Sequence, residues 1–149
     1  MSEKEISKNK KAYHDFELGE KFEAGLSLLG SEIKSLRKGK VQLKNSYVSL
    51  KNGEAFIKGM NISQYESSSS FFNHEEERDR KLLLHKSEIV KIASKSKLQG
   101  YTCIPLRVYL KGGKAKLEIA LAKGKSLYDK REDAKKKTME RAAQRTLRR

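Results

Sequence analysis

The sequence TCIPLRVYLKGGKAKLEIALAKG, residues 102–124, decides the fold of this chain. Apolar side chains recur at every second position on both sides of the pair Gly112-Gly113. They are Ile104, Leu106, Val108 and Leu110 before the pair and Ala115, Leu117, Ile119 and Leu121 after it. A period of two places alternate side chains on opposite faces of a strand, and glycines supply the conformations of a tight turn. The stretch therefore predicts a long antiparallel hairpin with one apolar face.

A second hairpin is predicted earlier in the chain. Residues 46–50 and 54–57 flank Lys51-Asn52-Gly53, and Asn-Gly between two alternating runs is a strong hairpin signal. Residues 22–28 also alternate, which predicts a further strand with Glu23 on the face opposite Phe22.

Apolar residues at helical spacing predict a short helix that begins at Gly30-Ser31 and ends at Gly39, and another that ends at Gly100. The whole pattern is mainly β, with five or six short antiparallel strands and two or three short helices. It favours a small closed or partly open antiparallel barrel of the OB-like type. A split sheet with helices packed on one face is the alternative.

Charge is the strongest clue to the partner. The chain has 34 Lys and Arg against 19 Asp and Glu, a formal net charge of +15. Residues 123–149 hold 11 basic and 4 acidic residues, so this stretch carries +7 (11 minus 4) and the rest +8 (15 minus 7). Such a segment has too few apolar groups to offset the entropy of ordering. We expect a polar arm over residues 1–8, a barrel over 9–124, and a basic tail over 125–149 that is disordered until it meets a polyanion. Nucleic acid is the first candidate.

Several kinds of chemistry find no support in the sequence. Cys103 is the only cysteine, which excludes an intrachain disulfide and a cysteine-based zinc cage, and its apolar neighbours predict a buried side chain. Gly124-Lys125-Ser126 resembles the end of a phosphate-binding loop, but Ile119 stands where that motif needs glycine. His74 beside Glu75-Glu76-Glu77 has no second ligand at a suitable spacing, which favours a solvated acidic loop. We expect no catalytic residue, metal or cofactor.

The location follows from what the chain lacks. No run reaches the roughly 18–20 apolar residues that cross a bilayer, and MSEKEISKNKK at the start has no apolar segment typical of a secretory signal. We expect a cytoplasmic monomer with no membrane partner.

Two positions point to RNA by their residue type. Glu23 would share its face with Lys116 and Glu118 of the last strand, where it either accepts hydrogen bonds from bases or holds a neighbouring Lys or Arg. Tyr128 is an aromatic residue within a basic run, an arrangement that suits stacking on an unpaired base.

Six short blocks occur together in this chain. They are NKKAYHD (9–15), FEAG (22–25), EIKSLR (32–37), GEAF (53–56), RKLLLH (80–85) and AKGK (122–125). On these blocks, residues 9–131 closely resemble the SsrA-binding protein family (small protein B) of bacterial trans-translation. The resemblance implies an OB-like barrel that binds the tRNA-like domain of tmRNA (SsrA RNA) and stands in for the missing anticodon arm. It also implies delivery of that RNA to the A site of a stalled ribosome, with the tail folding as a helix in the empty mRNA channel.

The resemblance also implies site residues. Those that match RNA-binding positions of the family are Asn9, Glu23, Leu83, His85 and Lys116. Those that match the segment engaging the ribosomal decoding region are Lys123, Gly124, Lys125, Tyr128, Asp129, Lys130 and Arg131. Thr146-Leu147 stands where some relatives carry two bulky apolar residues, so a grip that needs both is not expected here. The alternatives are a general ribosomal protein or RNA chaperone, and a small hydrolase using His14 or His85.

Overall fold

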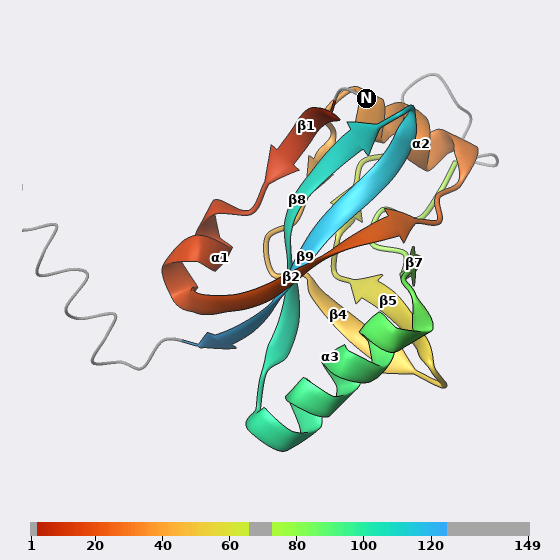
Figure 1. The fold of residues 1–149 in the computed structure, drawn as a ribbon. Helices are drawn as coiled ribbons and strands as arrows, with labels where there is room; N and C mark the ends of the chain where they lie inside the picture. The colour runs from red at the N-terminus through yellow and green to blue at the C-terminus, as the bar shows by residue number, and fades with distance from the viewer. Residues whose placement is uncertain (1–2, 66–72, 125–149) are drawn as a thin grey trace, which may run out of the picture.

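The computed structural model describes residues 3–65 and 73–124, which form nine strands and three helices (Figure 1). The strands are β1 (Glu3–Lys8), β2 (Phe16–Leu26), β3 (Val41–Gln42), β4 (Tyr47–Lys51), β5 (Glu54–Lys58), β6 (Asn61–Ile62), β7 (Arg80–Leu83), β8 (Thr102–Lys111) and β9 (Lys114–Gly124). The helices are α1 (Lys10–Asp15), α2 (Gly30–Arg37) and α3 (Lys86–Gln99). Seven strands form one antiparallel sheet in the order β1-β8-β9-β2-β7-β5-β4, and β3 pairs with β6 in a second sheet.

The hairpin predicted over residues 102–124 is confirmed, and both of its strands lie inside the sheet rather than at an edge. Strand β9 pairs with β8 on one side and with β2 on the other. Gly112 and Gly113 adopt φ of 58° and 78°, a region that side-chain-bearing residues rarely enter, so the turn needs this pair. The β4–β5 hairpin, the strand at residues 22–26 and the helices ending near Gly39 and Gly100 are also confirmed.

The large sheet curls until β4 lies beside the first half of β8 (Figure 1). No hydrogen-bonded ladder joins these two strands in the described part of the chain, so the barrel is partly open. The mainly β, OB-like prediction is confirmed in this form. The helices lie at different places around the barrel rather than on one sheet face, unlike the split-sheet alternative.

The start of the chain differs from the sequence prediction. Glu3–Lys8, expected as part of a polar arm, form strand β1, which pairs with β8. The strand covers an edge of the sheet whose N–H and C=O groups otherwise lack partners. Its residues are mostly charged, so the pattern alone carried no strand signal. Helix α1, a single short element after Asn9, was not predicted either.

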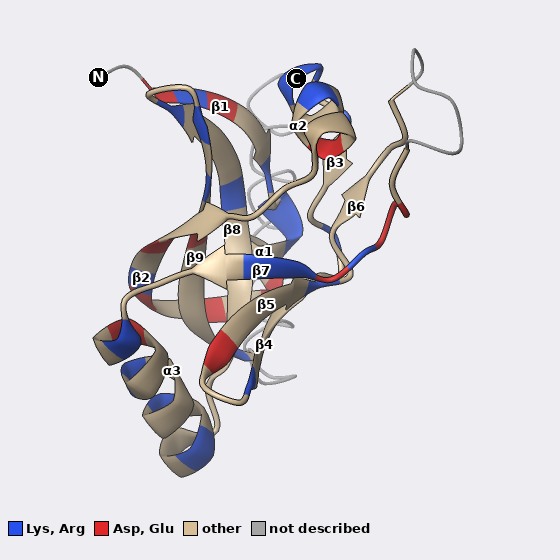
Figure 2. Ribbon diagram, turned by 90° about the vertical axis from the view of Figure 1, so that its right-hand side faces the viewer, with Lys and Arg blue, Asp and Glu red and all other residues tan. Residues whose placement is uncertain are grey.

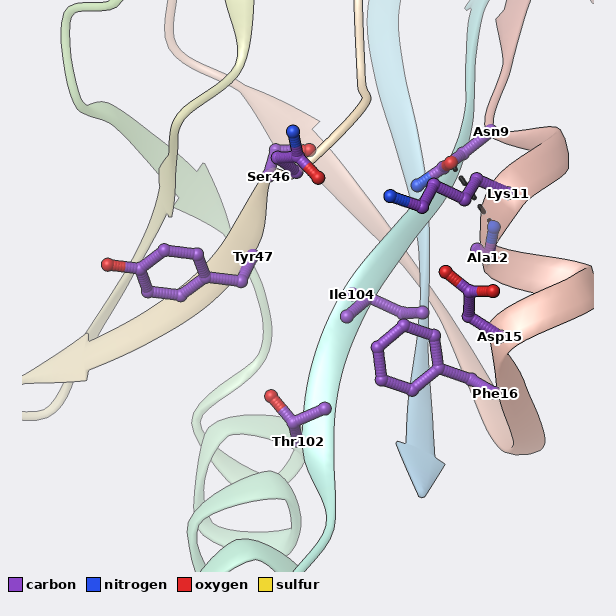
Figure 3. A pocket seen from close by; sticks show the side chains of 10 residues that line it. Asn9, Lys11, Ala12, Asp15, Phe16, Ser46, Tyr47, Thr102 and Ile104 are labelled. Atoms are coloured by element: carbon purple, nitrogen blue, oxygen red, sulfur yellow. Dashed lines mark hydrogen bonds between the residues drawn. The ribbon is translucent and has the colours of Figure 1, made fainter. Parts of the chain in front are cut away.

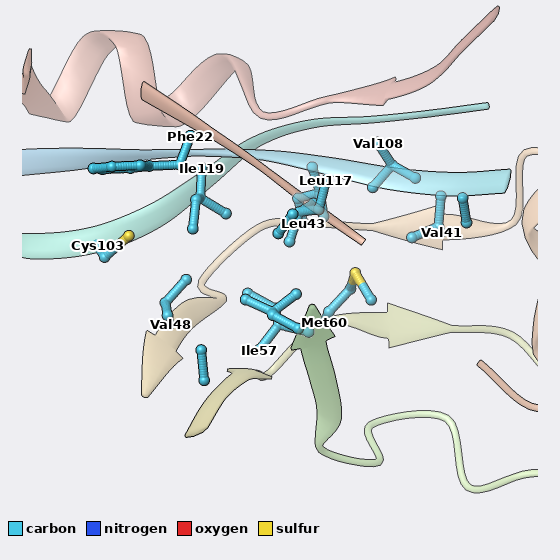
Figure 4. Packing of buried hydrophobic residues seen from close by; sticks show 14 of the residues in the cluster. Phe22, Val41, Leu43, Val48, Ile57, Met60, Cys103, Val108, Leu117 and Ile119 are labelled. Carbon is cyan, nitrogen blue, oxygen red and sulfur yellow. The ribbon is translucent and has the colours of Figure 1, made fainter. Parts of the chain in front are cut away.

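The main core fills the inside of the barrel (Figure 4). Its members include Phe22, Val41, Leu43, Val48, Ile57, Met60, Cys103, Val108, Leu117 and Ile119. Cys103 is buried as predicted, and burial raises the pKa of its thiol to about 12. The thiol is therefore an unreactive packing group.

A second, smaller apolar cluster lies outside the barrel, where α1 covers one end of the sheet. Ala12 of α1 packs there with Ile104, Leu106, Ala120 and Ala122. The outward positions of β9 are thus small and apolar under α1, and become Glu118 and Lys116 beyond it. Only the part of this face away from α1 is open to a partner.

A buried ion pair ties α2 to the start of β7. The Arg80 Nε donates to Glu32 at 2.6 Å, both side chains are fully buried, and Arg78 donates to the same carboxylate at 2.6 Å. Burial acts to raise the pKa of Glu32, but hydrogen bonds from Arg78, the Leu29 N–H and Arg80 outweigh it, so the pKa is lowered. The sequence pattern did not predict that Glu32 and Arg80 form a buried ion pair.

The interpretation of His74 as part of a solvated acidic loop is wrong for the histidine, although Glu75, Glu76 and Glu77 are exposed. His74 is buried; its Nε2 lies 2.8 Å from the Ile62 carbonyl oxygen and its Nδ1 2.8 Å from the Ser31 hydroxyl. The ring is a structural link between β6 and α2.

Candidate nucleic-acid interface

Three of the predicted RNA-binding side chains lie on one outer face of the barrel, formed by β8, β9, β2 and β7. We call this surface the outer strand face. Its residues are Glu23, Gly25, Leu83, Arg107, Tyr109, Lys111, Lys116 and Glu118. Phe22 and Ala24 point into the core, which turns Glu23 and Gly25 outward. Figure 2 shows Lys, Arg, Asp and Glu distributed over these strands.

The register brings Lys116 and Leu83 together across the sheet. Gly25 of β2 is the Cα partner of Lys116 on β9 and of Leu83 on β7. Leu83 is 56% exposed, so its apolar side chain is accessible to a partner at this surface. A partner at this surface would therefore meet the Lys116 cation on one side of Gly25 and the apolar Leu83 side chain on the other.

A groove of about 380 Å³ opens beside this pair. Its lining includes Leu29 and Ile33 at α2, Leu83, and Lys114 and Lys116 of β9. Leu29 is nearly half exposed. Apolar walls with cations at the rim match the needs of an unstacked nucleotide, whose base is flat and whose phosphate is charged.

Glu23 is held in place by two neighbours on β8. The Tyr109 hydroxyl donates to its carboxylate, and the Lys111 Nζ lies 3.4 Å from the same oxygen. The hydrogen bond from Tyr109 is the main reason that the pKa of Glu23 is lowered. Burial acts in the opposite direction, and Lys111 adds to the lowering. Burial and the bond to Glu23 raise the pKa of Tyr109. Within residues 3–65 and 73–124, the contacts from Tyr109 and Lys111 are both made to one carboxylate oxygen, Oε2 of Glu23.

Arg107 completes the polar network. It lies 3.2 Å from Glu118 and 3.3 Å from Glu3, and its guanidinium stacks 4.1 Å from the centre of the Tyr109 ring. Sequence reasoning did not single out Arg107, Tyr109 or Lys111. The signal was present, because these residues occupy the outward positions of the predicted hairpin.

The remaining two predicted RNA contacts lie elsewhere. Asn9 is buried at the N-cap of α1, where its Oδ1 accepts from Ala12 at 3.3 Å and its Nδ2 donates to the Pro105 carbonyl at 3.0 Å. It lines a cavity of about 320 Å³ near Phe16, Tyr47 and Ile104 (Figure 3). The polar atoms of Asn9 are thus engaged within the fold, and its contact with RNA stays a prediction.

His85 is exposed, two residues after Leu83 at the start of α3. Its backbone N–H donates to Glu88 at 3.0 Å. His85 therefore lies close in the chain to the outer strand face, and its role in binding stays a prediction.

The residues predicted to engage the decoding region lie at the far end of β9. Lys123 and Gly124 are exposed, and the Lys123 Nζ lies 4.7 Å from the centre of the Tyr101 ring. Lys123 lies seven residue steps along the strand from Lys116, a distance of about 23 Å. The other predicted members, Lys125, Tyr128, Asp129, Lys130 and Arg131, lie outside the described residues.

Other types of site were searched for in residues 3–65 and 73–124. No group of three or more His, Cys, Asp or Glu side chains is placed to hold a metal ion there. No helix in the same ranges is both long and apolar enough to span a membrane.

Comparison with known proteins agrees with the resemblance seen in the sequence. The family model described as SmpB protein matches residues 6–149. An SsrA-binding protein of Geotalea uraniireducens is 57% identical over 141 residues, covering 95% of this chain and 93% of the relative. One from Roseiflexus castenholzii is 51% identical over 145 residues, covering 97% and 92%. A solved structure described as "tmRNA-SmpB: a journey to the center of the bacterial ribosome" is similar with a TM-score of 0.68 and 40% identity, covering 81% of this chain and 85% of that one. The chain therefore belongs to the SmpB family of SsrA-binding proteins.

Proposed function

We propose that this protein is a non-enzymatic RNA-binding adaptor of trans-translation that acts in the cytoplasm. It binds the tRNA-like domain of tmRNA, takes the place of the anticodon arm, and delivers the RNA to the A site of stalled ribosomes. The observation that carries this proposal is the match to SsrA-binding proteins over nearly the whole chain, together with the likeness to the tmRNA–SmpB structure.

The barrel with its edge strand β1, residues 3–124, and the tail, residues 125–149, have separate tasks in this proposal. The outer strand face grips the folded RNA through Glu23, Leu83 and Lys116. The end of β9 leads into the tail, which engages the decoding region and the mRNA channel. The separation of about 23 Å along β9 supports this division, because the two ends of one rigid strand can reach two different partners.

The charge of the tail supports a role as a sensor of the empty channel. Residues 123–149 carry 11 basic against 4 acidic residues. Ordering on the order of 20 residues costs tens of kcal/mol at about 1–2 kcal/mol each, which only a large set of phosphate contacts can offset. When messenger RNA already occupies the channel, those contacts are not accessible and the tail does not fold there.

Deletion of residues 125–149 tests the proposal. We expect the shortened protein to bind the tRNA-like RNA with nearly unchanged affinity in a gel-shift assay. Peptide tagging on stalled ribosomes in a reconstituted translation system should be lost. If tagging persists, the adaptor mechanism is wrong. A uniform loss of affinity for all structured RNAs would indicate a general RNA chaperone, and turnover of the RNA by purified protein would indicate a hydrolase.

A further inference from the structure

Helix α2 presents a basic surface that none of the sites above uses. Lys34, Arg37 and Lys38 are exposed on and directly after it, and the Lys and Arg segments are blue in Figure 2. None of the three forms an ion pair with a carboxylate of residues 3–65 or 73–124. The helix has one acidic residue, Glu32, which is buried with Arg80.

Tyr65 gathers two of these cations. The Lys38 Nζ lies 5.0 Å and the Lys34 Nζ 5.5 Å from the centre of its ring. The backbone of Tyr65 is held on both sides by Asn73, whose Oδ1 accepts from the Tyr65 N–H at 3.0 Å and whose Nδ2 donates to the Tyr65 carbonyl at 2.8 Å. These bonds fix the backbone position of Tyr65, and its ring contacts both lysines.

Two ammonium groups on one ring repel each other. The cation–π attraction of each is about 0.5–1 kcal/mol at an exposed site, and a phosphate between or beside the two would remove the repulsion. Among the described residues, neither lysine forms an ion pair with a carboxylate. The arrangement is suited to an external anion.

The basic surface adjoins the outer strand face. Ile33 lines the groove that Leu83, Lys114 and Lys116 also line, and Lys34 is the next residue in the helix. Arg37 lies one helical turn after Ile33 on the same face, so a nucleic-acid strand that leaves the groove toward α2 meets Arg37 and then the neighbouring Lys34 and Lys38. This continuity favours a single RNA over two separate partners.

We propose that Lys34, Arg37, Lys38 and Tyr65 form a phosphate clamp that extends the RNA-binding surface from the groove onto α2. The clamp rests on the proposed function, and it binds the backbone of the same tRNA-like RNA that the outer strand face holds. Tyr65 is a positioning residue that keeps the two lysines side by side. Arg37, one turn after Ile33, contributes a third cation.

The double substitution Lys34→Gln/Lys38→Gln tests the clamp. We expect affinity for the tRNA-like RNA to fall about tenfold in low salt. The slope of log affinity against log salt should become shallower by about 1.5, because each lost phosphate contact contributes about 0.7–0.9. The matched control is Lys95→Gln/Lys97→Gln on α3, which removes the same charge at the other end of the molecule (Figures 1 and 2).

Tyr65 is tested separately. Tyr65→Phe keeps the ring and should bind like the unmodified protein, whereas Tyr65→Leu should lose about threefold in affinity, because the lysines are no longer aligned. Urea unfolding of every variant checks that the fold is kept. Equal affinity of the Phe and Leu variants would contradict the positioning role.

The clamp is overturned if the α2 double variant keeps its affinity and salt slope, or loses no more than the α3 control. It is overturned also if the α2 variant binds the tRNA-like RNA normally and fails only in co-sedimentation with ribosomes, since the phosphates would then be ribosomal. In either case, a weakened Lys116→Ala variant would show that the proposed RNA-binding function still stands.

Discussion

Gly25 lies directly across from Leu83 in the antiparallel pair of β2 and β7, and the two are in close contact. A Cβ built on Gly25 would come within 3.2 Å of the Leu83 Cβ and 3.3 Å of its Cδ1. The absence of a side chain at Gly25 therefore allows Leu83 to lie across the sheet toward Lys116. An exposed leucine thus has a defined position on the outer strand face.

The substitution Gly25→Ala should displace Leu83 and weaken binding of the tRNA-like RNA by about three- to tenfold. The barrel should stay folded, because the added methyl group meets a side chain at the surface rather than the core. Gly124→Ala is the matched control, since a Cβ there meets nothing within 4 Å. Gel-shift titration of both variants measures the effect, and equal affinities would show that the position of Leu83 does not matter.

Glu23→Ala and Lys116→Ala should each weaken binding of the tRNA-like RNA by about tenfold, the equivalent of ~1.4 kcal/mol. Lys116 would lose a charged contact, and Glu23→Ala would leave the Tyr109 hydroxyl without its acceptor. Lys97→Ala on α3 should bind normally. Circular dichroism confirms folding, and full affinity of either variant would remove that residue from the interface.

Glu32→Gln should destabilise the protein by about 3–5 kcal/mol at neutral pH, because it leaves the buried Arg80 guanidinium without a counter-charge. The pKa of Glu32 is lowered from 4.5 in the folded protein. The contribution of the ionised Glu32 carboxylate to the free energy of unfolding is therefore fully present above pH 4.5. It is lost as the pH falls through the lowered pKa that Glu32 has in the folded protein. The difference in unfolding free energy between the unmodified protein and the variant should narrow below pH 4.5. Urea unfolding at pH 7 and in that acidic range measures it, and a constant difference would contradict the assignment.

Cys103 should react with an aromatic disulfide reagent only after the protein unfolds. The side chain is buried and its thiol pKa is raised to about 12, so little thiolate forms and none is accessible. The rate of labelling in increasing urea should follow the unfolding transition. Rapid labelling in buffer alone would show that the barrel opens between β4 and β8 while the protein stays folded.

Much of the fold could be predicted from local pattern. The alternation around Gly112-Gly113 and around Asn52-Gly53 indicated two hairpins, and both are present with those turns. The end of α3 at Gly100, with φ of 68°, was likewise evident. These features depend on side chains close together in sequence, where periodicity and turn chemistry act directly.

Part of the candidate site could be predicted in the same way. Alternation placed Glu23 and Lys116 on the outward face, and the resemblance to the family added Leu83. Neither indicated that Tyr109 would hold Glu23, because that contact joins residues 86 positions apart. Asn9 was predicted to bind RNA only because the block at residues 9–15 resembles the family. The fold shows that its side-chain amide forms hydrogen bonds with the backbone of Ala12 and Pro105.

The sequence by itself determined the family, the antiparallel hairpins and the basic charge of the chain. Tertiary structure alone decided that β1 pairs with β8, that Glu32 and Arg80 meet in the interior, and that Lys34 and Lys38 converge on Tyr65. The physical reason is that these contacts join distant segments. Their partners are chosen by the register and curvature of the sheet, and neither can be read from a local run of residues.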